Sequence, residues 1–358
     1  MTATPFRSAA LLIGLLFYCS LPTFSQAPVP VFPGEQWERH ASWSDAGYDP
    51  EKARQIRQFI VDSMNTTGLY VVVQGKELFR FGDIEELSYL ASCRKSILAM
   101  MYGKYIENGT INPELTMEQL GFDDIQGLLP LEKKATVQDL ITARSGVYHP
   151  ASNSGDNAAD APERGSQEPG SYFLYNNWDF NAAGAAFEQL TGQNIYDAME
   201  TDIARPIGMQ DWDRSAQKKS GDTKQSRYQA YHVWLSTRDM ARIGQLMLHE
   251  GNWNGKQVIS RDWAKEIVRV VTPLEEMNPT RYRDGYFGYG YMWWVWDGPE
   301  ASGAFEGAYT ARGAIGQYIT VLPALDMVIS HKTNAKYSRS TSWNSYERLI
   351  QHFIDAKL

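Results

Sequence analysis

Some segments of the chain place apolar residues at the spacing of an α-helix, and others have the apolar pattern of β-strands. Both kinds of segment occur near each end of the chain. Residues 51–63 place apolar side chains on one side of a helix, and the runs 68–77 and 78–81 have the composition of strands joined by a turn. The last third predicts further strands and then a closing helix, at 304–312, 317–322, 327–331 and 346–354. We therefore expect one sheet built from both ends of the chain.

The middle of the chain reads mainly as helices and loops. Helical spacing and stop signals predict helices at 92–108, 137–143 and 181–191, and Thr237 is a plausible N-cap of another. Residues 150–170 form a polar loop without a core pattern. The fold class we expect is α/β of the α+β type, an antiparallel sheet flanked by helices with an inserted all-α region.

The expected domain boundaries follow from this order. A Pro-rich, Trp-bearing lead-in at 28–45 precedes one domain at 46–358. Within it, the α/β part covers about 46–100 and 225–358, and the helical insertion covers about 101–224.

The first 27 residues resemble a secretory signal peptide. Arg7 precedes an apolar run at 9–18, which is too short for a transmembrane helix, and Ser25-Gln26-Ala27 resembles a cleavage site. A lipoprotein site at Cys19 is disfavoured because the residue before it, Tyr18, is bulky. We expect a secreted or periplasmic protein without a transmembrane anchor.

Charge and histidine spacing exclude several classes of function. The chain has a formal charge of −8, and nucleic-acid binding needs a basic face, so we expect no nucleic-acid partner. The six histidines show no spacing typical of metal ligands. We therefore expect no metal and no cofactor.

The sequence Ser92-Cys93-Arg94-Lys95 at the start of a predicted helix is the first candidate for chemistry. Residues three apart on a helix share a face, so the Lys95 amine can take or relay the proton of the Ser92 hydroxyl. Cys93 is an alternative nucleophile, but helical phase turns it away from Lys95, and a small buried residue is the better interpretation. S-x-x-K alone is a weak signal.

Two later segments add to it. Tyr175-Asn176-Asn177 follows a Pro-Gly turn: a lysine cation would favour Tyr175 as a base, and the Asn177 amide could orient lysine and substrate. A surface tyrosine in a turn is the alternative. Ala311-Arg312-Gly313-Ala314 closes a strand where a ligand can approach the backbone closely, although a glycine-rich hairpin alone would look the same.

In this order and spacing, the chain resembles the serine β-lactamase and penicillin-binding protein superfamily. The likeness is greatest to its class C, esterase and 6-aminohexanoate-dimer hydrolase branch, over about residues 45–355. Further segments support it: 140–146, 169–170, 234–240 and 316–323.

The resemblance implies roles for particular residues. Ser92 would be the nucleophile, Lys95 and Tyr175 would share the acid/base work, and Asn177 would orient them. The backbone N–H groups of Ser92 and Ala314 would form the oxyanion hole.

The third motif departs from the family pattern. Lys-Thr-Gly is replaced by Ala311-Arg312-Gly313, which leaves the lysine slot empty and puts β-lactamase activity in doubt. Arg312 either grips a substrate carboxylate or pairs with a structural acid. Lys332-Thr333-Asn334 follows a later strand and lacks the glycine. We expect Arg312 and Gly313, with Trp178 and His149, to contact substrate.

We therefore predict a secreted serine hydrolase of a small ester or amide, and a substrate carboxylate if Arg312 binds one. One alternative is a penicillin-binding D-alanyl peptidase or class C-like β-lactamase. The other, from a different class, is a non-catalytic ligand-binding or sensor protein on the same fold.

Overall fold

The computed structural model describes residues 1–2 and 30–358. The predicted signal segment therefore lies outside the described residues, except for its first two positions. Residues 30–43 contain no helix, and Arg39 pairs with Glu77 in an isolated bridge. Of the residues described, none belongs to a helix long and apolar enough to cross a membrane. The boundaries proposed at 46, 100 and 225 remain predictions.

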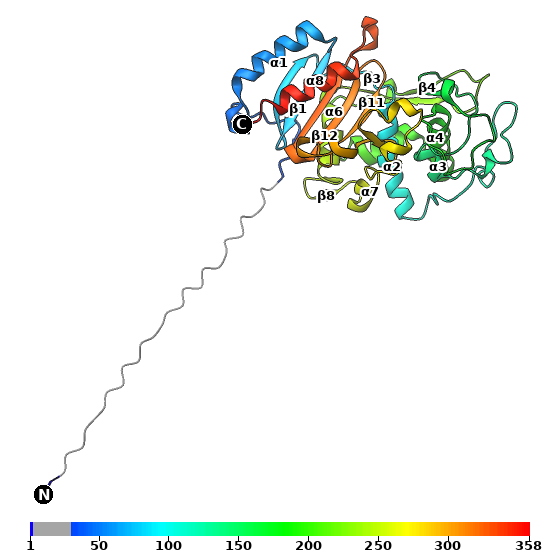
Figure 1. The fold of residues 1–358 in the computed structure, drawn as a ribbon, viewed down its shortest axis with the longest axis horizontal. Coiled ribbons are helices and arrows are strands. Elements are labelled where there is room, and N and C mark those ends of the chain that lie inside the picture. The colour runs from blue at the N-terminus through cyan, green and yellow to red at the C-terminus, as the bar shows by residue number, and fades with distance from the viewer. Residues whose placement is uncertain (3–29) are drawn as a thin grey trace.

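A seven-stranded antiparallel sheet organises the fold, as expected from the sequence (Figure 1). Its strand order is β2-β1-β13-β12-β11-β10-β9. The strands are β1 (Gly68–Val73), β2 (Lys76–Gly82), β9 (Phe287–Tyr289), β10 (Trp294–Trp296), β11 (Tyr309–Gly313), β12 (Gln317–Leu322) and β13 (Met327–Lys332). Because β1 pairs with β13, the two ends of the chain meet in the middle of the sheet.

Helices cover both faces of this sheet. Helix α1 (Pro50–Ser63) packs against α8 (Trp343–Ile354), whose Tyr346 stacks on Tyr318 of β12. Helix α6 (Thr237–Leu248) covers the opposite face, where Gly244 lies so close to Val328 that a Cβ atom would meet its side chain at 2.3 Å. Strands covered on both faces are apolar throughout, and β1 is accordingly buried along its whole length.

Helix α2 (Cys93–Glu107) connects the sheet to the helical region. It packs against β11 and β12 on one side and against α4 (Asn177–Thr191) on the other (Figure 1). The helical region also contains α3 (Val137–Ile141) and α5 (Ile195–Met199). The remaining short elements are β3 (Ser88–Tyr89), β4 (Lys218–Ser220), β5 (Ala230–His232), β6 (Trp234–Leu235), β7 (Asn252–Trp253), β8 (Lys256–Gln257) and α7 (Arg261–Glu266).

Three helix starts and one strand differ from the sequence prediction. Helix α4 begins at Asn177 rather than 181, because the Asn176 side chain caps it by accepting from the Trp178 N–H. Ser236, not Thr237, caps α6, and α8 begins three residues earlier than expected. Strand β11 is shorter than the predicted run from 304. Strands β9 and β10, rich in aromatic residues, were not predicted.

Candidate active site

A sharp turn places Ser92 at the start of α2. Strand β3 ends at Tyr89, and Ala91 adopts a left-handed backbone conformation with φ of 48°. A non-glycine residue in this region is held there by its surroundings. Ser92 follows as the N-cap, yet its side chain makes no capping hydrogen bond. The hydroxyl is therefore free for other chemistry, and Ser92 lines a cavity of about 460 Å³.

Lys95 lies one helical turn further on and bridges the two other predicted catalytic residues. Its Nζ donates to the Tyr175 phenol oxygen at 2.7 Å and to Asn177 Oδ1 at 2.6 Å. The same Nζ lies 4.2 Å from the centre of the Tyr175 ring and 4.3 Å from that of Phe180. Side chains 80 and 82 positions further along the sequence thus meet at the Lys95 amine.

Burial controls the proton affinity of this group. Lys95 is 1% exposed, and burial lowers the pKa of its amine well below the usual value, with the Arg94 charge acting in the same direction. Burial raises the pKa of Tyr175, whereas hydrogen bonding with the Ser92 side chain lowers it. A lysine that tends toward the neutral amine is suited to accept a proton.

Asn177 is positioned by the polar loop that precedes it. Its Nδ2 donates to the Ser154 carbonyl at 2.9 Å, and its backbone N–H donates to Asp156 Oδ2 at 2.8 Å. An amide whose nitrogen is occupied in this way must direct its oxygen to Lys95. Asp156 also lines the Ser92 cavity.

The end of β11 lies against the turn that carries Ser92. A Cβ atom on Gly313 would meet the Leu90 carbonyl oxygen at 2.5 Å and the Ser92 nitrogen at 3.1 Å. Ala314 lines the same cavity. Within the described residues, neither the Ser92 nor the Ala314 N–H donates a hydrogen bond. Two free N–H groups beside a serine hydroxyl can stabilise an oxyanion.

Arg312 lies in a cage of aromatic rings at the edge of this cavity. Its guanidinium carbon is 5.0, 4.8 and 4.4 Å from the ring centres of Phe287, Trp294 and Trp343. No carboxylate among the described residues forms an ion pair with it, so pairing with a structural acid is not what the structure shows. Its hydrogen-bond donors remain available to a ligand.

The structure does not place Trp178 and His149 in the cleft, which corrects two of the predicted substrate contacts. Trp178 is fully buried and donates from Nε1 to Asp124 Oδ2 at 2.7 Å. His149 is also buried, with Nε2 2.6 Å from the Ile125 carbonyl oxygen. Both anchor the segment around Asp124 because their polar atoms need buried partners.

The sequence offered Cys93 as another nucleophile and Lys332 as another lysine for the third motif. The structure shows where both lie. Cys93 is fully buried against β12, donates to the Gln317 carbonyl and has a raised pKa because of burial. A buried thiol of this kind is a poor nucleophile. Lys332 is buried on β13 and donates to the Glu86 carbonyl, and it does not line the Ser92 cavity.

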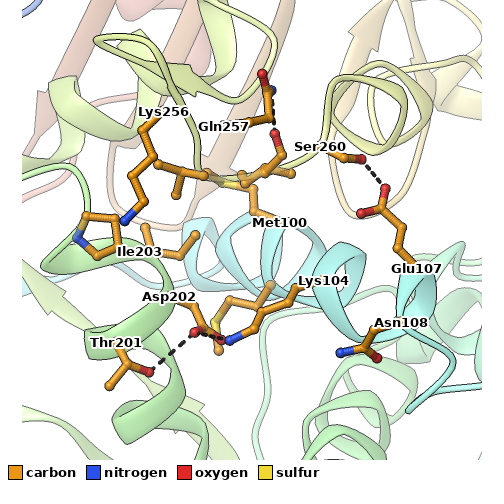
Figure 2. Close-up of a pocket in the computed structure, with 14 residues that line it drawn as sticks. Met100, Lys104, Glu107, Asn108, Thr201, Asp202, Ile203, Lys256, Gln257 and Ser260 are labelled. Carbon is orange, nitrogen blue, oxygen red and sulfur yellow. Dashed lines mark hydrogen bonds and ion pairs between the residues drawn. The ribbon is translucent and has the colours of Figure 1, made fainter.

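A second cavity, of about 660 Å³, lies at the other end of α2 (Figure 2). Its polar walls are formed by groups already in contact with one another. Lys104 pairs with Asp202 at 2.6 Å, and Ser260 donates to Glu107. It is larger than the Ser92 cavity, and Figure 2 shows the Ser260–Glu107 and Lys104–Asp202 contacts in it.

Several cavity residues were not predicted individually. Tyr282, Tyr318 and Trp343 line the Ser92 cavity, together with residues 340–342. Trp294 of β10 also lines this cavity. Residues 340–342, before α8, have no sequence pattern that marks them as cavity residues. Only the order of strands in the sheet brings them next to β11.

The fold thus brings the Ser92, Lys95 and Tyr175 side chains together at the start of α2, beside the end of β11. The Beta-lactamase family model matches residues 56–351. The chain therefore belongs to the Beta-lactamase family, whose members are serine hydrolases.

Solved structures of similar fold carry several names. A protein assigned as a 6-aminohexanoate-dimer hydrolase from Bacillus anthracis has 22% identity and a TM-score of 0.62, covering 84% of this chain and 80% of that one. A penicillin-binding protein homologue from Caulobacter crescentus has 13% identity and a TM-score of 0.60, covering 87% and 99%. EstCE1, a hydrolase with promiscuous acyltransferase activity, has 14% identity and a TM-score of 0.59, covering 86% and 97%.

One curated relative is similar in sequence over a short stretch. An uncharacterized protein of Alkalihalophilus pseudofirmus is 30% identical over 90 residues, which is 25% of this chain. The match spans about a fifth of that relative, 21% of its length.

Proposed function

We propose that this protein hydrolyses a small ester or amide through an acyl-enzyme on Ser92. The observation that carries the proposal is the Lys95 amine, which is buried and bridges Tyr175 and Asn177 one turn from the serine. A purely structural lysine at this depth would be expected to pair with a carboxylate. Here its partners are a phenol and an amide.

In the acylation step, Ser92 Oγ attacks the substrate carbonyl carbon. The hydroxyl proton passes to the Lys95–Tyr175 pair, and the carbonyl oxygen becomes an oxyanion near the Ser92 and Ala314 N–H groups. The carbon–oxygen or carbon–nitrogen bond then breaks, and the same pair returns the proton to the leaving alcohol or amine.

In the deacylation step, a water molecule attacks the ester formed on Ser92. Tyr175 and Lys95 take one proton from this water and return it to Ser92 Oγ as the acyl bond breaks. The products are a free carboxylic acid and the original enzyme, so no cofactor is needed to balance the reaction.

Arg312 favours a substrate that carries a carboxylate. Its aromatic cage fixes the guanidinium plane, and free N–H donors of arginine match a carboxylate with two parallel bonds. Ala311, which occupies the family's lysine position, is fully buried. The binding charge therefore comes from a different position than in β-lactamases, which ranks ester or amide cleavage above β-lactam hydrolysis.

Turnover of a p-nitrophenyl ester and of a penicillin by the mature protein and by Ser92→Ala tests this function. Ser92-dependent ester turnover without a lasting penicillin adduct supports it. A stable penicillin adduct supports a penicillin-binding peptidase instead. Ligand binding that survives in Ser92→Ala without turnover in either protein supports a sensor.

Export is part of the proposal, on the basis of the N-terminal segment 1–27. N-terminal sequencing of the protein recovered from a periplasmic or culture fraction tests it. An unprocessed N-terminus in the cytoplasmic fraction alone contradicts it.

A further inference from the structure

Arg94, directly before Lys95, is a buried charge that the mechanism above does not use. It is 1% exposed and its guanidinium carbon lies 4.2 Å from the centre of the Tyr231 ring. Among the described residues, Asn181 Oδ1 accepts from Nη2 at 3.0 Å, and no group accepts from Nη1. No carboxylate of the described residues forms an ion pair with it.

The two cations of α2 contact the same face of α4. Lys95 donates to Asn177 and Arg94 donates to Asn181, and residues four apart on a helix lie about 6 Å from each other. Both amide nitrogens donate to the loop at 152–154, so both amide oxygens are directed at the cations. This arrangement holds two positive charges close together in a region from which water is excluded.

Such an arrangement costs folding free energy, since a buried arginine without a carboxylate is unfavourable. A neutral side chain of similar size would fill the space beside Tyr231 equally well. Packing alone therefore does not account for a positive charge at position 94.

We propose that Arg94 is a positioning residue whose fixed positive charge favours the neutral, proton-accepting form of the Lys95 amine. This inference rests on the proposed function. Arg94 does not contact substrate and acts through Lys95 alone or through Lys95 and Tyr175 together. A guanidinium suits this role because it remains charged in proteins.

The other titratable groups around Arg94 and Lys95 do little to oppose the effect of the Arg94 charge on the Lys95 amine. Asp179 of α4 faces Lys95, but burial raises its pKa well above the usual value, which favours the uncharged acid. Asp156 in the loop favours the charged amine, and its oxygens already accept two backbone N–H groups. Burial lowers the pKa of His232 to about 4, so this ring is neutral. Of the described residues, the other titratable groups that act on the two cations are Tyr89, Cys93, Tyr175, Tyr196 and Tyr231.

The rate at which a fluorophosphonate labels Ser92, measured from pH 5 to 9.5, tests the inference. Without the Arg94 charge, Lys95 holds its proton more tightly, so the acid limb of the profile moves to higher pH. We expect Arg94→Met to move it by about one to two pH units, the size typical of removing one charge beside a buried titratable group.

Two further variants keep the test decisive. Asn181→Asp places a carboxylate beside Arg94 and should shift the limb in the same direction, even if Arg94→Met fails to fold. Arg242→Met removes another fully buried arginine, which lies on α6 and donates to the Ile207 carbonyl, and should leave the limb unchanged. A wild-type limb in Arg94→Met or in Asn181→Asp, or an equal shift in Arg242→Met, overturns the inference. Absence of Ser92 labelling in the wild type overturns the proposed function, and this inference with it.

Discussion

The backbones of Gly313 and Ser92 are in such close contact that no side chain fits between them. A Cβ atom on Gly313 would lie 3.1 Å from the Ser92 nitrogen and 2.5 Å from the Leu90 carbonyl oxygen. The strand end that carries Ala314 is therefore held directly against the start of α2. This contact brings the two N–H groups of the proposed oxyanion hole together.

Gly313→Ala tests the importance of that contact. The added methyl group must push β11 away from the Ser92 turn, and loss of an oxyanion-hole donor costs roughly 10²- to 10³-fold in kcat. We expect a kcat at least tenfold lower, measured by steady-state ester hydrolysis. Gly34→Ala, at a site with open space, serves as the control. Unchanged kcat in Gly313→Ala would contradict the assignment.

Tyr175→Phe removes one hydroxyl group and retains the ring. The ring packs against Phe180 and Trp294, so the fold should survive. Loss of a general acid/base lowers kcat by about 10²- to 10⁴-fold, and circular dichroism confirms folding. Tyr282→Phe removes a hydroxyl from the same cavity and should change kcat less than threefold, on the order of a neutral change. Equal effects of both variants would remove Tyr175 from the mechanism.

Arg312→Gln separates acidic from neutral substrates. We expect KM for an ester bearing a carboxylate to rise by about one to two orders of magnitude, and KM for a neutral ester to stay nearly constant. Arg281→Gln is the matched control, because that arginine is already paired with Asp160 at 2.7 Å. The same change in KM for both esters would show that Arg312 acts only in packing.

The acid limit of stability depends in part on His331. Burial lowers the pKa of this ring from 6.5 to about 4, so the folded protein keeps it neutral while the unfolded chain binds a proton. Stability is therefore fully present above pH 6.5 and is lost as the pH falls toward 4, by up to about 1.4 kcal/mol per pH unit.

Urea unfolding of the wild type and His331→Gln at pH 7 and pH 5 measures this contribution. Between pH 7 and pH 5, we expect the free energy of unfolding to fall by about 1–2 kcal/mol less in the variant than in the wild type. His232, whose pKa is also lowered to about 4, retains its own part of the acid sensitivity. An identical loss in both proteins would refute the assignment to His331.

Local patterns in the sequence were sufficient to predict most strands of the sheet and to single out Ser92, Lys95 and Tyr175 as candidates. Helix α2, strands β12 and β13 and the β1–β2 hairpin are apolar runs with glycine, proline or asparagine residues at their boundaries. Lys95 and Tyr175 could be paired because the resemblance to a known family connects distant motifs.

The sequence was less informative where tertiary contacts decide whether a segment is a strand or where a side chain lies. Strands β9 and β10 are only three residues long, and their aromatic residues fit a core, a cleft wall or a strand equally well. Trp178 and His149 were misplaced because periodicity does not reveal which buried carboxylate a polar atom finds. The role of Trp343 beside Arg312 depends on the order of strands in the sheet.

The most direct test of the account is the intact mass of the mature protein after exposure to a fluorophosphonate, with Ser92→Ala as the control. The account predicts one added phosphonyl group in the wild type, located by peptide mapping on Ser92, and none in Ser92→Ala. An adduct that persists in Ser92→Ala, or no adduct in the wild type, would contradict the central claim that Ser92 is the nucleophile.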